Sequence, residues 1–340
     1  MGSLIDELSK KSFIIVSGKG GVGKTTFASA LGFRLAEKKN KKVLVVSIDP
    51  AHSLGDIFST EIGSKITELA RRLYGLEFDP VKIFATERDM LIKALSSGSG
   101  MDLQALPVDD EMIDFLLDMQ LPYEFAEGIG FMKLFYGLIE KKEYDIVIFD
   151  TAPTGHTLEL LKLPEFLESF YGKMIRFRLK MSRIFSRIKA LFGFTTDDKA
   201  DIALRALEET KKEIEIVRKI LMEEKKTEFV VVMIPNEMSI LESLRLIGEL
   251  EVHEIPNKNV VVNFVRIYSG ECSFCNSLSQ YHHRQLLKIK EKIGDKNLWV
   301  LPYLSEEIRG IKSLQKIADH IGRLTIGQAI DLISSRETIE

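Results

Sequence analysis

Short apolar runs alternate with longer amphipathic stretches along most of the chain. Runs such as Val43–Ile48 are continuously apolar and rich in β-branched residues, which is typical of strands buried on both faces of a parallel sheet. The pattern predicts strands at Phe13–Ser17, Val43–Ile48, Val81–Ala85, Ile146–Phe149, Phe229–Ile234, Val260–Val265 and Leu298–Leu301. It predicts helices at Lys24–Lys39, Asp198–Glu224, Ser239–Glu251, Ser277–Ile293 and Ile308–Ile321. This alternation favours an α/β fold with a doubly wound, mostly parallel sheet.

Two stretches, Met90–Ile139 and Leu163–Phe194, interrupt the alternation. Both lack strand signals and are rich in Met, Phe and Leu. We interpret them as an α-helical subdomain inserted into the α/β core. The predicted order is core (1–89), subdomain (90–139), core (140–162), subdomain (163–196) and core (197–340).

Composition and charge narrow the class of protein. A chain of 340 residues suits two domains of roughly 150 residues each, or one large domain with an insertion. With 45% hydrophobic and 29% charged residues, it can bury a sizeable core, which excludes a disordered or collagen-like chain. The net charge of −3 gives no overall attraction to nucleic acid, so we expect no nucleic-acid partner.

The compartment is indicated by the cysteines and by the apolar stretches. Two cysteines in the whole chain fit a reducing compartment. Residues 1–11 lack the apolar segment of a signal peptide, and no apolar stretch approaches the roughly 18 residues of a membrane span. We therefore expect a soluble, cytoplasmic protein.

A phosphate-binding motif lies between the first predicted strand and the helix after it. It reads Gly18-Lys19-Gly20-Gly21-Val22-Gly23-Lys24-Thr25 and satisfies G-x-x-x-x-G-K-[ST] in the context that the motif requires. The glycines let backbone N–H groups surround phosphate oxygens, and the helix N-terminus adds positive potential. Lys24 is expected to reach the β- and γ-phosphates, and the Thr25 hydroxyl to ligate Mg²⁺. The motif predicts a P-loop nucleoside triphosphatase, with residues 18–25 and Thr26 binding the nucleotide.

A second lysine in the loop introduces a family resemblance. Because Lys24 already serves the phosphates of its own chain, Lys19 is free to reach a phosphate bound by a partner chain; the alternative is that it is a solvated lysine of the loop. The run Lys19–Thr26 resembles the deviant Walker A loop of dimeric ATPases that include partition ATPases, nitrogenase iron protein and anion-pump ATPases. Asp49–Asp56 and Asp150–Thr157 resemble, almost letter for letter, switch I and switch II of the arsenite-pump and tail-anchored-protein-targeting ATPases. The resemblance extends to Cys272–Cys275 and to Leu301–Gly310, so it covers nearly the whole chain.

The two switch segments supply candidate carboxylates for hydrolysis. Asp49 follows a buried strand, where a carboxylate can orient or deprotonate the attacking water. The resemblance assigns that role to Asp49, although the residues alone would equally allow it to contact Mg²⁺ through water. Asp150 ends an apolar strand and is interpreted as the Walker B aspartate that holds a Mg²⁺-bound water. The predicted catalytic residues are therefore Asp49, Lys19 and Lys24.

The resemblance also implies how the base is recognised. It suggests an adenine pocket formed by Asn263 and by the loop Pro302–Arg309, with Pro302 and Leu304 as contacts. An Asn side chain can donate to and accept from an adenine edge, which favours ATP over GTP. By analogy with those ATPases alone, we expect Glu237 to contact the nucleotide across the dimer.

The cysteine pair Cys272 and Cys275 has the spacing of a metal or redox motif. One C-x-x-C supplies two thiolates, whereas structural Zn²⁺ takes four ligands, so a homodimer with the pair at its two-fold axis would complete the site. Alternatives are His282 and His283 as local ligands, a redox pair or unused thiols. The resemblance favours zinc shared across the dimer. An iron–sulfur cluster is disfavoured, because in nitrogenase iron protein the two cysteines lie in separate segments.

An apolar stripe with helical spacing runs along the second inserted stretch. Its members are Phe166, Phe170, Met174, Phe177, Met181, Phe185, Ile188 and Phe192. Residues 171–194 carry seven basic residues and no acid, whereas residues 102–130 carry eight acids and no base. A stripe of this kind is an ordinary core face in most proteins, but Phe and Met also suit an adaptable binding surface.

In the targeting ATPases, such helices form a composite groove for the transmembrane helix of a client. The resemblance therefore implies a groove here, and its expected lining is Met112, Leu116, Met119, Phe125, Phe170, Met174, Phe177, Met181, Phe185 and Ile188. A dimer or domain core and direct membrane docking are the alternatives. A nucleic-acid-binding surface is disfavoured, because the basic residues are not interleaved with polar side chains that could contact bases.

Three functions follow from these features. The leading one is an ATP-driven homodimer, or a higher oligomer, that shields the transmembrane helix of tail-anchored proteins and delivers them to a receptor at a membrane. The second is the ATPase of an arsenite or antimonite pump; that relative joins two ATPase halves in one chain and binds metalloid through three cysteines, whereas this chain has one loop and one pair. The third, a partition-type ATPase, has no need of a large Met- and Phe-rich insertion.

Overall fold

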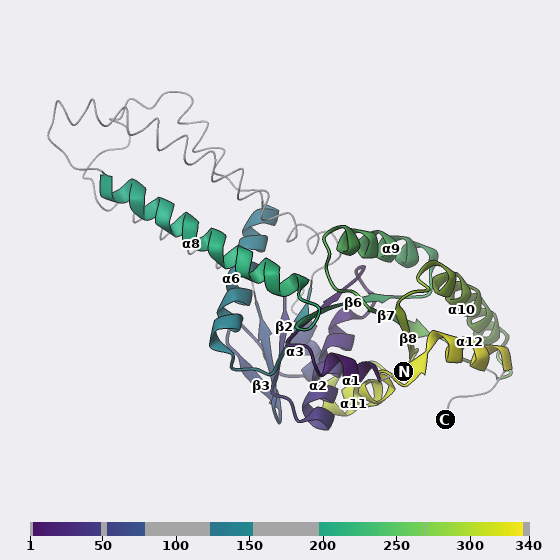
Figure 1. The fold of residues 1–340 in the computed structure, drawn as a ribbon. Helices are drawn as coiled ribbons and strands as arrows, with labels where there is room; N and C mark the ends of the chain where they lie inside the picture. Colours follow the sequence, from purple (N-terminus) through teal and green to yellow (C-terminus); the bar gives the residue numbers. More distant parts are fainter. Residues whose placement is uncertain (1–2, 49–52, 79–122, 152–196, 269, 336–340) are drawn as a thin grey trace, which may run out of the picture. The chain divides into compact units, whose positions relative to one another are not determined.

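The computed structural model describes residues 3–48, 53–78, 123–151, 197–268 and 270–335 (Figure 1). The chain divides into two compact units. One comprises Met1–Phe78, Lys142–Leu158 and Lys219–Glu340, and the other comprises Asp79–Lys141 and Glu159–Arg218. Most of the predicted helical subdomain falls outside the described residues, so its boundaries stay predictions.

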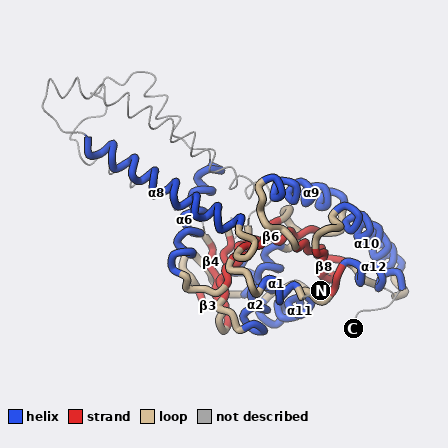
Figure 2. The backbone as a smooth tube through the Cα atoms, viewed as in Figure 1, coloured by secondary structure: helices blue, strands red, loops and turns tan. Residues whose placement is uncertain are grey.

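The first unit is built on one sheet of nine described strands (Figure 2). The strands are β1 (Phe13–Ser17), β2 (Val43–Ser47), β3 (Thr67–Ala70), β4 (Leu73–Glu77), β5 (Ile146–Asp150), β6 (Thr227–Met233), β7 (Asn259–Val265), β8 (Asn297–Pro302) and β9 (Leu324–Thr325). Their order is β3-β4-β2-β5-β1-β6-β7-β8-β9. The pairs β3–β4 and β8–β9 are antiparallel and the others are parallel. This confirms the predicted α/β class with a mostly parallel sheet.

Helices cover both faces of this sheet, which explains why the central strands are apolar throughout. Ile14 and Val16 of β1 share a buried cluster with Phe27 and Leu31 of α2 (Lys24–Lys39) and with Leu314 of α11 (Gly310–His320). Three other helices contribute nothing to that cluster, although each has buried residues of its own: α9 (Glu237–Val252), α10 (Ser273–Lys292) and α12 (Ile326–Ser335). Figure 1 shows α2 and α11 on one side of the strands and α9 and α10 on the other.

The observed helices agree with most of the predicted ones. They are α1 (Leu4–Leu8), α2 (Lys24–Lys39), α3 (Ser53–Phe58), α6 (Tyr123–Lys141), α8 (Asp197–Met222), α9 (Glu237–Val252), α10 (Ser273–Lys292), α11 (Gly310–His320) and α12 (Ile326–Ser335). Helix α2 has the predicted bounds, whereas α10 begins four residues earlier than predicted, because Cys272 caps it. The sequence missed α1, α3 and α12, which are short. No helix in the described ranges has the length and apolar character of a membrane span.

The predicted strands agree with the observed ones to within two residues wherever both can be compared. The strand predicted at Val81–Ala85 lies outside the described residues. Strands β3, β4 and β9 were not predicted. Of these, β3 is only partly buried, β4 contains a glycine, and β9 has two residues, so none of them forms a long apolar run.

Candidate functional site

The phosphate loop follows the carboxyl end of β1, at the point where the order of the strands in the sheet reverses. From β1 the chain passes through α2 to β2 on one side, whereas β6 lies on the other side of β1. Ligands of open α/β sheets bind at such a switch point. The described fold therefore places the loop where a nucleotide is expected.

Two glycines of the loop are required by close approaches rather than by flexibility alone. A Cβ on Gly18 would lie 2.1 Å from the Val232 carbonyl oxygen of β6. A Cβ on Gly23 would lie 2.5 Å from Asn263 Nδ2, and its φ of 87° is in the left-handed region that favours glycine. The loop therefore packs closely against both β6 and the end of β7.

Lys24 is the first residue of α2, and its ammonium turns back over the loop. The residue is 5% exposed, and its Nζ donates to the Lys19 carbonyl oxygen across 3.2 Å. Thr25 and Thr26 follow in the first turn of α2 and are half-buried. A lysine ammonium over the loop and hydroxyls at the helix N-terminus are the groups that the predicted phosphate and Mg²⁺ contacts need.

The candidate carboxylate Asp150 is buried at the same edge of the sheet. It ends β5, where it lies in register with Val16 of β1 and Ser47 of β2. Ser47 Oγ donates to Asp150 Oδ2 at 3.5 Å, and Thr151 Oγ1 donates to the Val16 carbonyl across 3.1 Å. Asp49 lies outside the described residues, two positions beyond the end of β2.

Asn263, predicted to contact adenine, is fully buried and bound to the loop. Its Nδ2 donates to the Val22 carbonyl across 2.9 Å, and its Oδ1 accepts from the Phe264 N–H at 2.9 Å. The chain bends here, since Phe264 has a φ of 58° and the pairing of β7 with β8 shifts register. Asn263 therefore holds the loop in this structure, and its contact with adenine stays a prediction.

Of the other predicted nucleotide contacts, Pro302 and Leu304 are half-buried and Glu237 is exposed. Pro302 ends β8, and Leu304 packs against the core cluster. Between them Tyr303 is 54% exposed, and its ring lies 6.0 Å from that of Phe264. Glu237 begins α9, and its carboxylate pairs with Lys288 of α10 across 3.2 Å.

Lys19 has a partner that the sequence does not indicate. Its Nζ lies 2.8 Å from Glu242 Oε1, in an ion pair with α9. The two residues are 223 positions apart, and no local motif marks Glu242. Only the neighbouring positions of β1 and β6 bring them together.

Cys272 and Cys275 lie at the exposed start of α10. Cys272 is the N-cap and its Sγ accepts from the Cys275 N–H at 3.5 Å. Hydrogen bonds from Cys275 hold the pKa of the Cys272 thiol below its ordinary value. The Arg266 guanidinium donates to Cys275 Sγ across 3.3 Å. A lowered pKa favours the thiolate form of Cys272, which suits metal binding and redox chemistry alike.

The histidines near this pair have other partners. Burial lowers the pKa of His282 to about 4, and its Nδ1 accepts from the Arg266 backbone N–H at 2.8 Å. His283 Nε2 lies 3.0 Å from the Ser334 hydroxyl. Within the described part of the chain, no third Cys, His, Asp or Glu joins the two cysteines in a metal-binding group.

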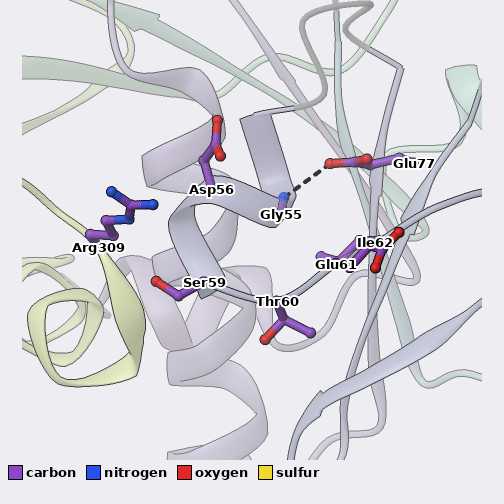
Figure 3. A pocket seen from close by; sticks show the side chains of 8 residues that line it. All are labelled: Gly55, Asp56, Ser59, Thr60, Glu61, Ile62, Glu77 and Arg309. Atoms are coloured by element: carbon purple, nitrogen blue, oxygen red, sulfur yellow. Dashed lines mark hydrogen bonds between the residues drawn. The ribbon is translucent and has the colours of Figure 1, made fainter.

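A pocket of about 360 Å³ opens beside α3 (Figure 3). Its lining is Gly55, Asp56, Ser59, Thr60, Glu61, Ile62, Glu77 and Arg309. The Gly55 N–H donates to Glu77 Oε1 across 2.9 Å, and Arg309 lies on the side of Asp56 and Ser59. The predicted switch I contributes Gly55 and Asp56 to this lining, and the predicted adenine loop contributes Arg309.

The predicted groove residues cannot be placed. Met112, Leu116, Met119, Phe170, Met174, Phe177, Met181, Phe185 and Ile188 lie outside the described residues. Phe125 belongs to α6, but the structure does not describe its side chain.

The mostly parallel sheet and the loop after its central strand define the class as a P-loop nucleoside triphosphatase. Comparison with known proteins narrows the class. Residues 11–323 match the model of the family described as anion-transporting ATPase. The chain therefore belongs to the anion-transporting ATPase family and is an ATPase, which confirms the resemblance derived from its motifs.

Individual relatives match most of the chain. ATPase GET3B of Arabidopsis thaliana is 34% identical over 92% of this chain and 79% of its own. ATPase ASNA1 homolog 1 of Paramecium tetraurelia is 31% identical over 90% of this chain and 91% of its own. ATPase GET3 of Komagataella phaffii is 33% identical over 94% of this chain and 92% of its own.

Proposed function

We propose that this ATPase is a homodimeric, cytoplasmic targeting factor that shields the transmembrane helix of tail-anchored proteins and delivers them to a receptor at a membrane. The observation that carries the proposal is one phosphate loop with a second lysine, in a chain whose switch and cysteine motifs resemble those of targeting ATPases. The similarity to ATPase ASNA1 homolog 1 of Paramecium tetraurelia and ATPase GET3 of Komagataella phaffii over nine-tenths of the chain supports it.

In this proposal, ATP hydrolysis uses the groups at the carboxyl edge of the sheet. The loop N–H groups and Lys24 bind the phosphates, and Asp49 orients the attacking water. Thr25 and Asp150 provide hydroxyl and carboxylate oxygens, the ligands that Mg²⁺ prefers. Bound Mg²⁺ supplies charge neutralisation at the phosphates.

We further propose that zinc joins two copies of the chain through Cys272 and Cys275. Cys272 is exposed and Cys275 is half-buried, and no third ligand joins them among the described residues, which fits half of a tetrahedral site. The second copy would supply the other two thiolates. Zinc would then hold the subunits together while ATP binding closes the dimer and hydrolysis loosens it.

Closure is proposed to assemble the client groove across the two subunits. The acidic residues 102–130 and the basic residues 171–194 are complementary in charge, which supports their pairing as groove walls. Hydrolysis would loosen the dimer and release the client at the membrane.

Co-expression with a tagged protein that ends in a transmembrane segment tests this proposal. Wild type is compared with Phe177→Asp/Met181→Asp, which places two carboxylates on the apolar stripe, and with Ser182→Asp/Ser186→Asp, which places them beside it. We expect a soluble complex with wild type and with the serine variant, and none with the stripe variant. Absence of a complex with all three, over several segments, would reject the groove.

A metalloid pump ATPase is the second candidate, because the family as a whole is described as anion-transporting. Its soft metalloid site would need thiolates, and this chain has two cysteines in a single C-x-x-C. Antimonite is the discriminating reagent. We expect no stimulation of ATP hydrolysis by antimonite, and a clear stimulation would favour the pump.

A further inference from the structure

The side chain of Lys19, which the proposed function sends to a partner's phosphate, is engaged within its own chain. Its Nζ and Glu242 Oε1 lie 2.8 Å apart, so the contact is both an ion pair and a hydrogen bond. The side chains are 35% and 29% exposed, respectively. Both side chains are therefore partly buried, which strengthens their ion pair, yet solvent and other ligands can still reach them.

The loop side of this pair is fixed by the sheet. Val16 of β1 lies in register with Val230 of β6, so the loop after β1 and the helix after β6 leave the same edge. Gly18 passes so close to the Val232 carbonyl that no side chain fits between them. The next residue, Lys19, must therefore emerge beside α9.

The α9 side of the pair is fixed by capping. Asn236 is the N-cap, and its side chain accepts from the Ser239 N–H at 2.9 Å. The Ser239 hydroxyl accepts from the Ile234 N–H at 3.1 Å. With the start of α9 held in this way, Glu242 presents its carboxylate at a defined position one turn into the helix.

Lys19 is held at its backbone as well as at its side chain. Its carbonyl accepts from Lys24 Nζ, the ammonium that is expected to contact the bound phosphates. Incoming phosphates therefore compete for Lys24 with the Lys19 carbonyl, and a partner's phosphate competes for Lys19 with Glu242. Both lysines of the loop have intrachain acceptors to exchange for phosphate.

We propose that Glu242 is a positioning residue that keeps the Lys19 side chain bound within its own protomer until the dimer closes on a triphosphate. The inference rests on the proposed function, in which Lys19 acts across the dimer. A polyphosphate carries more negative charge than one carboxylate, so the exchange favours the partner only when nucleotide is bound there. The pair thereby opposes closure of a dimer without nucleotide.

Binding of a non-hydrolysable ATP analogue tests the role without requiring turnover. A partly exposed ion pair of this kind changes a binding equilibrium constant by about two- to fivefold per protomer. We expect Glu242→Gln to bind the analogue about two- to fivefold more tightly than wild type. The matched control is Glu251→Gln, which removes the same charge from α9 where Glu251 pairs with Lys296 across 2.9 Å.

Repeating the measurement in a Lys19→Met variant shows whether Glu242→Gln acts by releasing Lys19 or only by removing a negative charge. There, adding Glu242→Gln should produce no further change, because the lysine that it releases is absent. An equal tightening in that background, or no tightening in the Lys19 protein, would overturn the role of Glu242. Thermal unfolding of each variant establishes that the fold is intact.

The same series distinguishes failure of this inference from failure of the proposed function. If Lys19→Met weakens analogue binding while Glu242→Gln leaves it unchanged, the lysine works as proposed and Glu242 does not restrain it. If Lys19→Met binds the analogue as tightly as wild type, the contact across the dimer itself is refuted, and the inference with it.

Discussion

Asn263 Nδ2 donates to the carbonyl oxygen of Val22 across 2.9 Å, joining the end of β7 to the phosphate loop. Both residues are buried, and they are 241 positions apart in the chain. A buried carbonyl that loses its donor is destabilised, so the loop depends on this amide for its shape. The contact gives Asn263 a part in ATP binding that does not require it to touch the base.

Replacing this amide should separate the two roles of Asn263. We expect Asn263→Ala to weaken ATP binding by roughly tenfold, because the Val22 carbonyl is left without its donor. If Asn263 only holds the loop, GTP binding falls by the same factor. If it also contacts adenine, ATP loses more than GTP. Titration of both nucleotides, with thermal unfolding as the control for folding, measures the difference.

Gly18→Ala should damage the loop through a steric clash with β6. The new Cβ would lie 2.1 Å from the Val232 carbonyl oxygen, which belongs to a central strand and cannot move aside. We expect a loss of about 1–3 kcal/mol in the free energy of unfolding, together with loss of ATP binding. Denaturant titration and nucleotide binding are the measurements.

Gly248→Ala is the matched control for that substitution. Gly248 lies inside α9, and its Cβ would meet nothing within 4 Å. Alanine there should stabilise the protein by about 0.5–1 kcal/mol, since glycine weakens a helix interior. Equal stability of the Gly18→Ala and Gly248→Ala variants would contradict the close approach at β6.

Asp49→Asn should separate ATP binding from hydrolysis. An amide has nearly the shape of the carboxylate but cannot accept a proton from the attacking water. We expect ATP binding to be retained and turnover to fall by about a hundredfold or more, as measured by phosphate release. Asp331→Asn, on the exposed face of α12, is the control. Normal turnover of the Asp49→Asn variant would remove Asp49 from the catalytic role.

The cysteine pair should bind one zinc ion for every two chains. We expect Cys272→Ser and Cys275→Ser each to lose the metal, because each removes two of the four ligands from a dimer. Metal analysis with light scattering measures stoichiometry and mass together, and Ser273→Ala is the control. One zinc ion per chain would favour local ligands over a shared site.

Glu228 should make the stability of the protein depend on pH. It is fully buried on β6. Its Oε1 accepts from the Lys258 N–H at 2.8 Å and from the Asn259 N–H at 3.0 Å. Its Oε2 lies 3.7 Å from Lys11 Nζ. Burial raises the pKa of Glu228 above its ordinary value of 4.5, despite these contacts. A raised pKa means that the folded protein holds this proton more tightly than the unfolded chain does.

The sign of the pH dependence follows from that difference. The contribution of Glu228 to stability is fully present below pH 4.5 and is lost as the pH rises through its folded pKa. Glu228→Gln cannot titrate and keeps an oxygen acceptor. We therefore expect the wild type to gain free energy of unfolding relative to this variant as the pH falls from about 8 toward 4.5. A constant difference across this range would show that Glu228 does not titrate there.

Local patterns were sufficient for the central elements and for the phosphate loop. The strand Phe13–Ser17 and the helix Lys24–Lys39 were predicted with their observed bounds, because a buried parallel strand is an unbroken apolar run and a helix repeats at a fixed spacing. The motif between them needs only adjacent residues. By itself, then, the sequence determined the α/β class, the loop and the family.

Tertiary structure decided what those local patterns leave open. Glu77 is polar, yet it is buried at the end of β4, where the Gly55 N–H donates to its carboxylate. Lys19 meets Glu242, and Val22 meets Asn263, only because β6 and β7 follow β1 in the sheet. Such contacts depend on which strands become neighbours, and residues more than two hundred positions apart leave no periodic signal of their pairing.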